Sequence, residues 1–479
     1  FTEQYDDVTA LILEAGGLFE FSKRLKDGSL SLPELSSESR PMTMAEKIIA
    51  RNLVGQPEGS CVQPDDPVIA QVQGGYSHEF TTAQVHTFLQ ETYGDEYQLT
   101  NPKKFGVFED HLLYAHHNPK FVPFMDKVET LRELQKTFQA HTGVRDYSAV
   151  DGVSPGICHQ VAREEFIEVS DFIQATDSHT CMGGASNALT WGVGATEYAN
   201  LVSAGFTFVK VPESIRFEFS GTLTEGCTAK DVILHILADH ARKELTLNRS
   251  MEFGGPGLQS LSADERATLC NMATECSART GICEADDVLY DWMESQMPHL
   301  NMEEQRLRAV APDEGARYHG GVHHIDLSSI RPMVAHPGNP DEGIPSDPTN
   351  GAYIDDILSG ATYKDIVSGL TAGKTSAAPS LLGNVISAWA WVWLILALLC
   401  ARREHCKAAW GGKFGHAEEP CARRLLQRQR RRLRRPRLRP QRPWRAAHVA
   451  CRQRQFWPAR SSAGERRASS RACAHATRS

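Results

Sequence analysis

Four short segments of the sequence bear histidine, carboxylate or amide side chains, and three of the segments contain a histidine. A carboxylate fixes the tautomer of a neighbouring imidazole and raises its basicity, which prepares the ring for proton transfer. One such pair alone is more often a helix cap beside a surface histidine, but three histidines with three acids predict acid–base chemistry on a polar substrate. The residues are Asp110 and His111 in FEDHLLYAHH, His159 in GICHQV, Asp177, Ser178 and His179 in ATDSHT, and Asn271 and Glu275 in CNMATE.

From residue 42 to about residue 338, the sequence alternates between strand and helix patterns. This alternation predicts a layered α/β architecture that would position these segments. The ranges 206–211 and 214–221 are predicted strands. In the second, Ile215, Phe217 and Phe219 would lie on one face, because successive side chains of a strand point to opposite faces.

Two capped helices are predicted after these strands. Thr228 can cap a helix whose apolar residues recur at helical spacing. Ser262 and Glu265 have the S-x-x-E spacing of a capping box, and the helix that they open is expected to run through Asn271 to Glu275. Asn271 and Glu275 would then share one face of the helix, because they lie four residues apart.

The overall composition is that of a soluble globular protein. Of the 479 residues, 41% are hydrophobic and 23% are charged, which excludes collagen-like and wholly disordered classes. Twelve cysteines are too dilute for a secreted disulfide scaffold, so a reducing compartment is the default. The first residues are acidic, whereas a mitochondrial transit peptide is rich in arginine. We expect a cytoplasmic location, and these features leave a mitochondrial one open.

Residues 401–479 differ from the rest of the chain in charge. They hold 23 Lys and Arg against 4 Asp and Glu, so the net charge of −8 combines +19 in this part with −27 in residues 1–400. An apolar run at 385–401 precedes an arginine-rich stretch at 423–445, patterns that a membrane anchor or a nucleic-acid-binding tail could have. We favour translated intron or frame-shifted sequence, because tryptophans beside an arginine run match neither a packed domain nor a linker. We therefore expect no nucleic-acid partner and no membrane association.

Longer segments around the histidine clusters resemble the aconitase family, and most closely the large subunits of 3-isopropylmalate dehydratase and their homoaconitase-like relatives. The resemblance covers roughly residues 42–376 and includes several independent motifs in the family's order. These are MTMAEKIIARNLVG, HEFTTAQ, DGVSPGICHQ, QATDSHTCMGGASNALTWGVGATEYANL, GCTAKDVILHIL, LSADERATLCNMATECSARTGI and PMVAHPGNPDEGIPSDPTNGAYID.

The resemblance implies a three-layer α/β/α body that contains domains 1 and 2 and the start of domain 3, without the family's swivel domain. On this basis we expect a loosely attached N-terminal extension at 1–41 and aconitase-like α/β domains at 42–333. A connection and the start of a truncated third domain would follow at 334–376, and an atypical tail at 377–479. In two-subunit members the swivel domain is a separate small protein, so a small partner subunit is implied.

The resemblance also implies an activity. Family members move a hydroxyl group between adjacent carbons of a di- or tricarboxylic acid by dehydration and rehydration, and 3-isopropylmalate of leucine biosynthesis is one such acid. Hydroxide is a poor leaving group, so it needs a proton from a positioned acid. The matched positions are the proton-donating pair Asp110 and His111, His159 paired with Asp177, His179 paired with Glu275, the substrate-binding Gln84 and Ser178, and the cluster-adjacent Asn271.

The cysteine ligands of the family's [4Fe–4S] cluster are not matched. Members hold this cluster through one cysteine of a G-S-C-T segment and a later C-x-x-C pair. Leu370 falls where the first cysteine belongs, and the chain has no C-x-x-C, since Cys400, Cys406 and Cys421 have other spacings. The cluster is therefore expected from the resemblance alone, and the family's substrate-binding arginines and its serine base would lie beyond residue 376 or on the swivel domain.

Other interpretations remain open. A catalytically inactive truncated homologue, unable to bind the cluster, is the principal alternative, and an arginine-rich RNA-binding protein rests only on the tail. Gly369, Gly373, Lys374 and Thr375 are one residue short of a phosphate-binding loop, so we interpret them as a damaged G-S-C-T-A-G-K segment. Four further cysteines are interpreted as buried small hydrophobic residues rather than ligands: Cys181, Cys270, Cys276 and Cys283.

Overall fold

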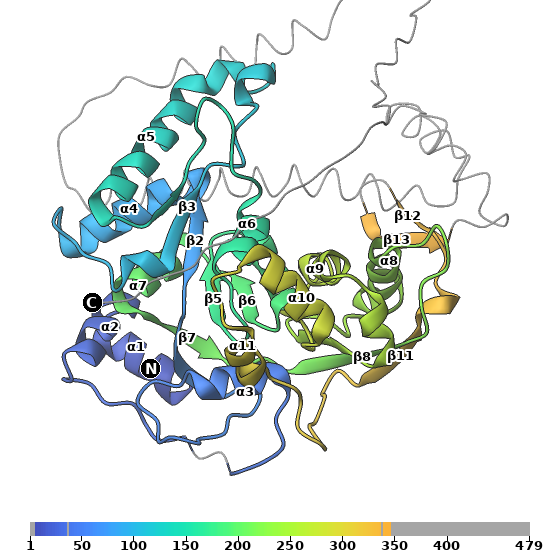
Figure 1. Cartoon of the computed structure of the whole chain (residues 1–479). Coiled ribbons are helices and arrows are strands. Elements are labelled where there is room, and N and C mark those ends of the chain that lie inside the picture. The colour runs from blue at the N-terminus through green and yellow to red at the C-terminus, as the bar shows by residue number, and fades with distance from the viewer. Residues whose placement is uncertain (1–4, 36–37, 337–338, 346–479) are drawn as a thin grey trace, which may run out of the picture. The chain divides into compact units, whose positions relative to one another are not determined.

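A sheet of parallel strands carries the histidine-bearing segments. In the computed structural model, which describes residues 5–35, 38–336 and 339–345, β2 pairs with β3 and β3 with β4, all in parallel (Figure 1). Helices α4 and α5 lie in the crossovers between these strands. The bounds are β2 Gly75–His78, α4 Glu79–Tyr93, β3 Phe105–Phe108, α5 Met125–Thr142 and β4 Arg145–Tyr147.

Two further strands, β5 (Phe172–Ala175) and β6 (Leu189–Gly192), form a two-stranded sheet beside β2. They pair with each other in parallel, and the Thr176 N–H donates to Tyr76 O at 3.1 Å, which joins the end of β5 to β2. An isolated parallel bridge between Gly74 and Ile173 also joins the two sheets, so their strands lie side by side in the order β6, β5, β2, β3, β4. Because the carboxyl ends of parallel strands meet at one edge, the segments that follow β2, β3 and β5 leave the sheet side by side.

A second parallel sheet has the strand order β10, β9, β8, β11. Helices α8 and α9 pack against each other, and their apolar residues form one core cluster with Phe217, Phe219 and Phe253 of the sheet. The predicted strands at 206–211 and 214–221 are confirmed as β7 and β8, each one residue shorter than expected. The bounds are β7 Phe206–Lys210, β8 Ser214–Ser220, α8 Ala229–Asp239, β9 Ser250–Gly254, α9 Ala263–Asn271, β10 Thr280–Cys283 and β11 Val322–Asp326.

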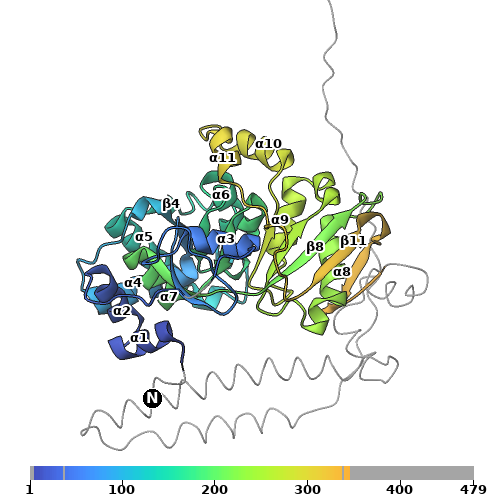
Figure 2. The same ribbon diagram turned by 90° about the horizontal axis from the view of Figure 1, so that it is seen from below.

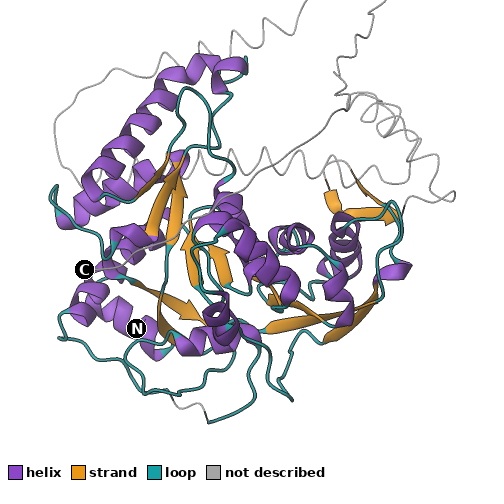
Figure 3. Cartoon of the chain, viewed as in Figure 1, coloured by secondary structure: helices purple, strands orange, loops and turns teal. Residues whose placement is uncertain are grey.

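Helices lie on both sides of the strands (Figure 3), which is the three-layer α/β/α arrangement that the sequence predicted. Figure 2 shows α10 and α11 beside α6, at the margin of the body. Among the described residues, no helix combines the length and the apolar character needed to cross a bilayer. The remaining elements are α3 Met44–Arg51, β1 Pro67–Gln71, α6 Cys158–Glu165, α7 Ala195–Ala204, α10 Asp287–Gln296, α11 Met302–Arg308, β12 Met333–His336 and β13 Asn339–Pro345.

The N-terminal segment is attached more firmly than expected. It forms α1 (Asp7–Ala15) and α2 (Leu18–Lys26). The Phe21 side chain is fully buried and shares an apolar cluster with Ile69 of β1 and Phe206 of β7. The expectation of a loose attachment is therefore wrong for these two helices, because their apolar residues are buried against the edge of the body.

Helix α9 ends earlier than the sequence predicted. Its capping box is confirmed, since the Ser262 N–H donates to Glu265 Oε2 at 2.9 Å and the Glu265 N–H to Ser262 Oγ at 3.3 Å. The helix stops at Asn271, and the chain then turns until Ser277, which has a positive φ of 55°. Asn271 and Glu275 therefore do not share a helix face, because a turn separates them.

Candidate active site

A buried carboxylate at the start of α4 holds the loop that carries Asp110 and His111. Glu79 is fully buried, and its two oxygens accept backbone N–H groups from Asp110 at 3.2 Å, His111 at 2.7 Å and Leu112 at 2.6 Å. Burial raises the pKa of Glu79, while these hydrogen bonds favour its charged form. The loop after β3 is thus anchored to the segment after β2, as adjacent ends of parallel strands allow.

The imidazole of His111 lies between two carboxylates. Its Nδ1 is 2.6 Å from Asp110 Oδ1, and its Nε2 is 3.2 Å from Asp177 Oδ2. The hydrogen bond to Asp110, followed by that to Asp177, raises the pKa of His111 to about 10. His111 is therefore an imidazolium at neutral pH and has a proton to donate.

Asp177 connects the three predicted histidines. Besides His111, it accepts the His179 N–H at 2.6 Å and lies 3.6 Å from His159 Nδ1. Burial alone would raise the pKa of the Asp177 carboxyl, but hydrogen bonds from His111 and from the His179 N–H outweigh it and hold the pKa below its usual range. The predicted pairing of His159 with Asp177 is thus a loose contact, and the tighter partner of Asp177 is His111.

The predicted pair of His179 and Glu275 is formed across 96 residues of sequence. His179 Nε2 lies 2.9 Å from Glu275 Oε1, and this hydrogen bond raises the pKa of His179. Oε2 of Glu275 is buried without a hydrogen-bond partner among the described residues. The pair can therefore hold a proton on His179 while one carboxylate oxygen stays available to a further donor.

His159 differs from the other two histidines in its charge state. It lies in the first turn of α6, next to Cys158, whose N–H donates to Asp110 Oδ2 at 2.7 Å. Burial lowers the pKa of His159, so the ring is neutral at neutral pH. The site thus combines a charged imidazole at His111 with a neutral one at His159, which is the asymmetry that acid–base catalysis uses.

His78 belongs to the site, although the sequence analysis did not select it. Its ring stacks on that of His111 with 4.0 Å between centroids and 17° between planes. Burial, followed by the charge of His111, lowers the pKa of His78 to about 4, and its Nδ1 is buried without a described partner. The signal available in the sequence was the His-Glu pair that opens HEFTTAQ, where both residues face the same site.

The remaining predicted residues lie at the margin of this cluster or outside it. Ser178 is exposed, and its Oγ is 3.2 Å from His179 Nδ1. Asn271 is half-buried at the end of α9, and its carbonyl oxygen accepts from Cys181 Sγ at 3.3 Å. Gln84 is exposed on α4, and none of the described hydrogen bonds connects it to the histidines.

Two triplets of side chains have the proximity of possible metal ligands. The first triplet consists of His78, Glu79 and His111, and the second of Cys158, His159 and Asp177. Within each triplet, the possible ligand atoms lie within 4.8 Å of one another. In the first triplet, Glu79 already accepts three backbone N–H groups and His111 contacts two carboxylates. In the second triplet, Asp177 Oδ1 lies 3.6 Å from His159 Nδ1 and its Oδ2 contacts His111.

Comparison with known proteins identifies the group to which this network belongs. The sequence profile of the aconitase family (aconitate hydratase) matches residues 46–377, which is more than half of the chain. The chain belongs to the aconitase family.

Several relatives within the aconitase family are named as large subunits. The chain is 29% identical to the methanogen homoaconitase large subunit of Methanocaldococcus jannaschii, over 69% of this chain and 74% of the relative. It is 30% identical to a probable 3-isopropylmalate dehydratase large subunit of Methanosarcina mazei, over 67% and 71%. It is 31% identical to 3-isopropylmalate dehydratase large subunit 1 of Methanopyrus kandleri, over 68% and 72%.

Members of the aconitase family generally bind a [4Fe–4S] cluster, and the described cysteines of this chain do not fit one. Iron–sulfur ligation needs thiolates that converge on the cluster. Burial raises the pKa of Cys181 to about 12, and Cys270 Sγ contacts Cys283 Sγ at 3.7 Å in the core. No described triplet contains more than one cysteine. The prediction that Cys181, Cys270, Cys276 and Cys283 are buried is confirmed, while Leu370, Cys400, Cys406 and Cys421 lie outside the described residues.

Proposed function

We propose that this chain is the large subunit of an aconitase-type hydro-lyase that removes water from a hydroxy di- or tricarboxylic acid and adds it back. The observation that carries the proposal is the imidazolium of His111 between Asp110 and Asp177. Relatives named 3-isopropylmalate dehydratase and homoaconitase support this substrate class. We propose 3-isopropylmalate, and with it a place in leucine biosynthesis, as the first substrate to test.

The proposed chemical role of His111 is to protonate the departing hydroxyl group. Asp110 holds Nδ1 at 2.6 Å, whereas the contact of Nε2 with Asp177 is longer, at 3.2 Å, and is the one that a substrate hydroxyl would replace. Transfer of the Nε2 proton converts the hydroxyl into water as its bond to carbon breaks. In the hydration direction, His111 takes one proton back from the attacking water.

The other site residues would complete this proton network. His159, whose pKa is lowered, and His179, whose pKa is raised, flank the shared carboxylate of Asp177, so a proton lost from His111 can be replaced through this network. Ser178 presents an exposed hydroxyl beside His179 and is proposed to bind a substrate carboxylate, together with Gln84. Asn271 is proposed to lie beside the cluster. The serine base that the family resemblance implies would lie beyond residue 376 or on the swivel domain.

A small partner subunit is proposed to cover this site. Four large apolar side chains near Asp110 and His159 are strongly exposed, by 59% to 72% of their surface. Exposed apolar groups in one region are typical of protein–protein contacts. The names of the relatives as large subunits support a partner of this kind. The four residues are Tyr114, Val150, Val153 and Ile157.

The second candidate is a non-catalytic homologue. It is supported by the absence of a C-x-x-C pair from the given sequence and by the described residues, among which no group of possible metal ligands contains more than one cysteine. This candidate keeps the proposed division into an extension at 1–41, a body at 42–333, a connection at 334–376 and a tail at 377–479, with a proton network that no longer acts on a substrate.

One experiment separates the two candidates. The full chain, alone and with a small subunit of a related dehydratase, is treated anaerobically with iron and sulfide, and bound iron, visible absorption and hydration of isopropylmaleate are measured. About four irons per chain with turnover that falls at least a hundredfold in His111→Gln would support the hydro-lyase. Neither iron binding nor turnover in the presence of the small subunit would support the non-catalytic homologue.

A further inference from the structure

A cavity of about 440 Å³ adjoins the candidate active site. Thr176 and Ser178, which flank Asp177 in the chain, line one part of it. The rest of its lining comes from the β6–α7 connection and from the two loops that precede β9 and β10. Most of the lining side chains are polar, so the cavity suits a polar group rather than an aliphatic one. The polar residues are Thr176, Ser178, Glu197, Asn248, Thr274 and Arg279.

Arg279 supplies a cation to this cavity, and although the charge of Glu197 acts on it, no described acid forms an ion pair with it. Its guanidinium lies over the Trp191 ring, 5.4 Å from the centroid, and none of the hydrogen bonds or ion pairs among the described residues involves this side chain. Its Nε is buried without a partner. An unpaired buried donor is unfavourable, and a guanidinium presents two parallel N–H groups that match a carboxylate.

The acidic side chain of the same cavity has another role. Glu197 Oε2 accepts the Gly194 N–H at 2.9 Å and so caps the N-terminus of α7. The positive end of the helix stabilises this carboxylate where it lies. Glu197 therefore lowers the net positive charge of the cavity but leaves the hydrogen-bonding edge of Arg279 without a direct acceptor.

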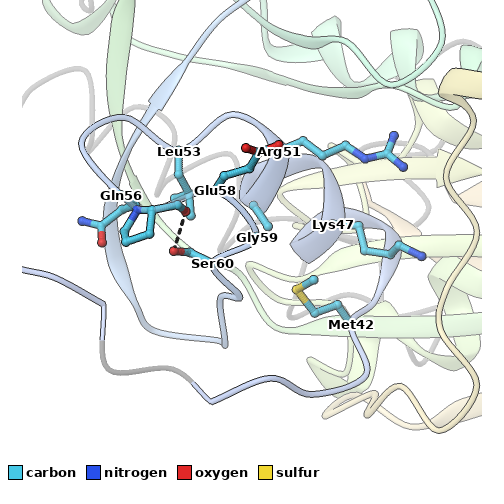
Figure 4. Close-up of a pocket in the computed structure, with 10 residues that line it drawn as sticks. Met42, Lys47, Arg51, Leu53, Gln56, Glu58, Gly59 and Ser60 are labelled. Atoms are coloured by element: carbon cyan, nitrogen blue, oxygen red, sulfur yellow. Dashed lines mark hydrogen bonds between the residues drawn. The ribbon is translucent and has the colours of Figure 1, made fainter.

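A second cavity, of about 380 Å³ beside α3, provides a contrast. Its lining contains two cations, Lys47 and Arg51, and both of them have partners. Lys47 Nζ lies 2.7 Å from Asp313 Oδ1, and Arg51 Nη1 donates to Arg308 O at 2.6 Å. Figure 4 shows both side chains extending away from the loop that carries Gln56. An unengaged cation thus distinguishes the cavity of Arg279.

We infer that Arg279 binds a carboxylate group of the hydroxy acid substrate in this cavity, with Ser178 and Asn248 as further donors. Ser178 connects the two parts of the site, because its Oγ lies 3.2 Å from His179 Nδ1 while its side chain also lines the cavity. A substrate held by Arg279 would therefore extend from the proton network of His179 into this cavity. This inference rests on the proposed function, but its test measures binding rather than turnover.

The test is calorimetric titration of the full chain with citrate, a soluble polycarboxylate, and with sulfate for comparison. The variants are Arg279→Met, Arg279→Lys and, as a matched control, Arg242→Met at an exposed arginine. Citrate affinity is expected to fall roughly tenfold to a hundredfold in R279M, because charge-assisted hydrogen bonds to the guanidinium are lost. It should fall less in R279K, which keeps the charge, and stay unchanged in R242M.

NMR spectra show whether citrate occupies the site as a substrate would or binds as a general anion. Citrate that binds as a substrate does should shift the imidazole NMR signals of His179 in the wild-type chain and not in R279M. Equal citrate affinity in R279M and wild type, with unchanged circular dichroism, would overturn the inference. Citrate binding through Arg279 without any change at His179, or equal binding of sulfate, would also overturn it, because the cavity would then be a separate or general anion site.

Discussion

The His78 ring stacks on the His111 ring with centroids 4.0 Å apart and planes inclined by 17°. The two imidazoles have opposite preferences for a proton, since the pKa of His78 is lowered to about 4 and that of His111 is raised to about 10. The neutral ring of His78 therefore covers one face of the charged ring of His111. This stack keeps the His111 nitrogens directed at Asp110 and Asp177, which is the arrangement a proton donor needs.

The first prediction concerns this stack. His78→Ala removes the ring that covers His111, so His111 can rotate away from the 3.2 Å contact with Asp177. Its pKa is then expected to fall toward the ordinary value near 6.5. His78→Phe keeps a flat ring in place and should leave the pKa raised. Imidazole NMR titration of the three proteins measures the effect, and equal pKa values in the alanine and phenylalanine variants would contradict the role of the stack.

The second prediction concerns pH. Because the folded pKa of His111 is raised to about 10, the stabilisation that its charged form provides is complete below pH 6.5 and is lost as the pH rises toward 10. His78 affects the unfolding free energy in the opposite direction. Because its folded pKa is lowered to about 4, the unfolded chain binds a proton more readily, and stability is lost as the pH falls from 6.5 toward 4. Unfolding free energy measured between pH 4 and 10 should decline at both ends. Asp110→Asn should move the alkaline decline to lower pH, and an unmoved decline would argue against the Asp110 contact as its cause.

The third prediction concerns the anchor of the catalytic loop. Glu79→Gln replaces a carboxylate that accepts three backbone N–H groups with an amide that can accept through one oxygen only. We expect a loss of about 2 kcal/mol in unfolding free energy from the unpaired buried groups. Faster hydrogen exchange should appear at residues 109–112. Glu91→Gln, at an exposed position of the same helix, is the control and should change neither quantity.

The fourth prediction concerns a buried ion pair beside α9. The fully buried guanidinium of Arg266 contacts both oxygens of Asp286, each at 2.6 Å. Asp286→Asn leaves this charge buried without its partner, so we expect a loss of about 3 kcal/mol or more in denaturant unfolding. Asp287→Asn, one residue later and exposed, should cost less than about 1 kcal/mol. Similar losses in the two variants would contradict this account.

Much of the local structure could be predicted from short-range patterns. The capping box at Ser262, the cap at Thr228 and the strand at 214–221 all follow from residues within one turn or one strand, and the structure contains each of them. The prediction that this helix continues to Glu275 was wrong, because nothing in the spacing of residues indicates that α9 stops at Asn271. Propensity and periodicity specify where an element can begin more firmly than where tertiary packing ends it.

The sequence by itself determined the class of chemistry and the family, because histidine, carboxylate and amide types occur in short motifs that can be recognised without coordinates. Only the tertiary structure decided how these residues pair: that Asp177 serves His111 more closely than His159, that Glu79 anchors the loop of His111, and that His78 covers its ring. The physical reason is the parallel sheet. It brings the segments after β2, β3 and β5 to one edge, and residues up to about a hundred positions apart then meet at distances that no local pattern contains.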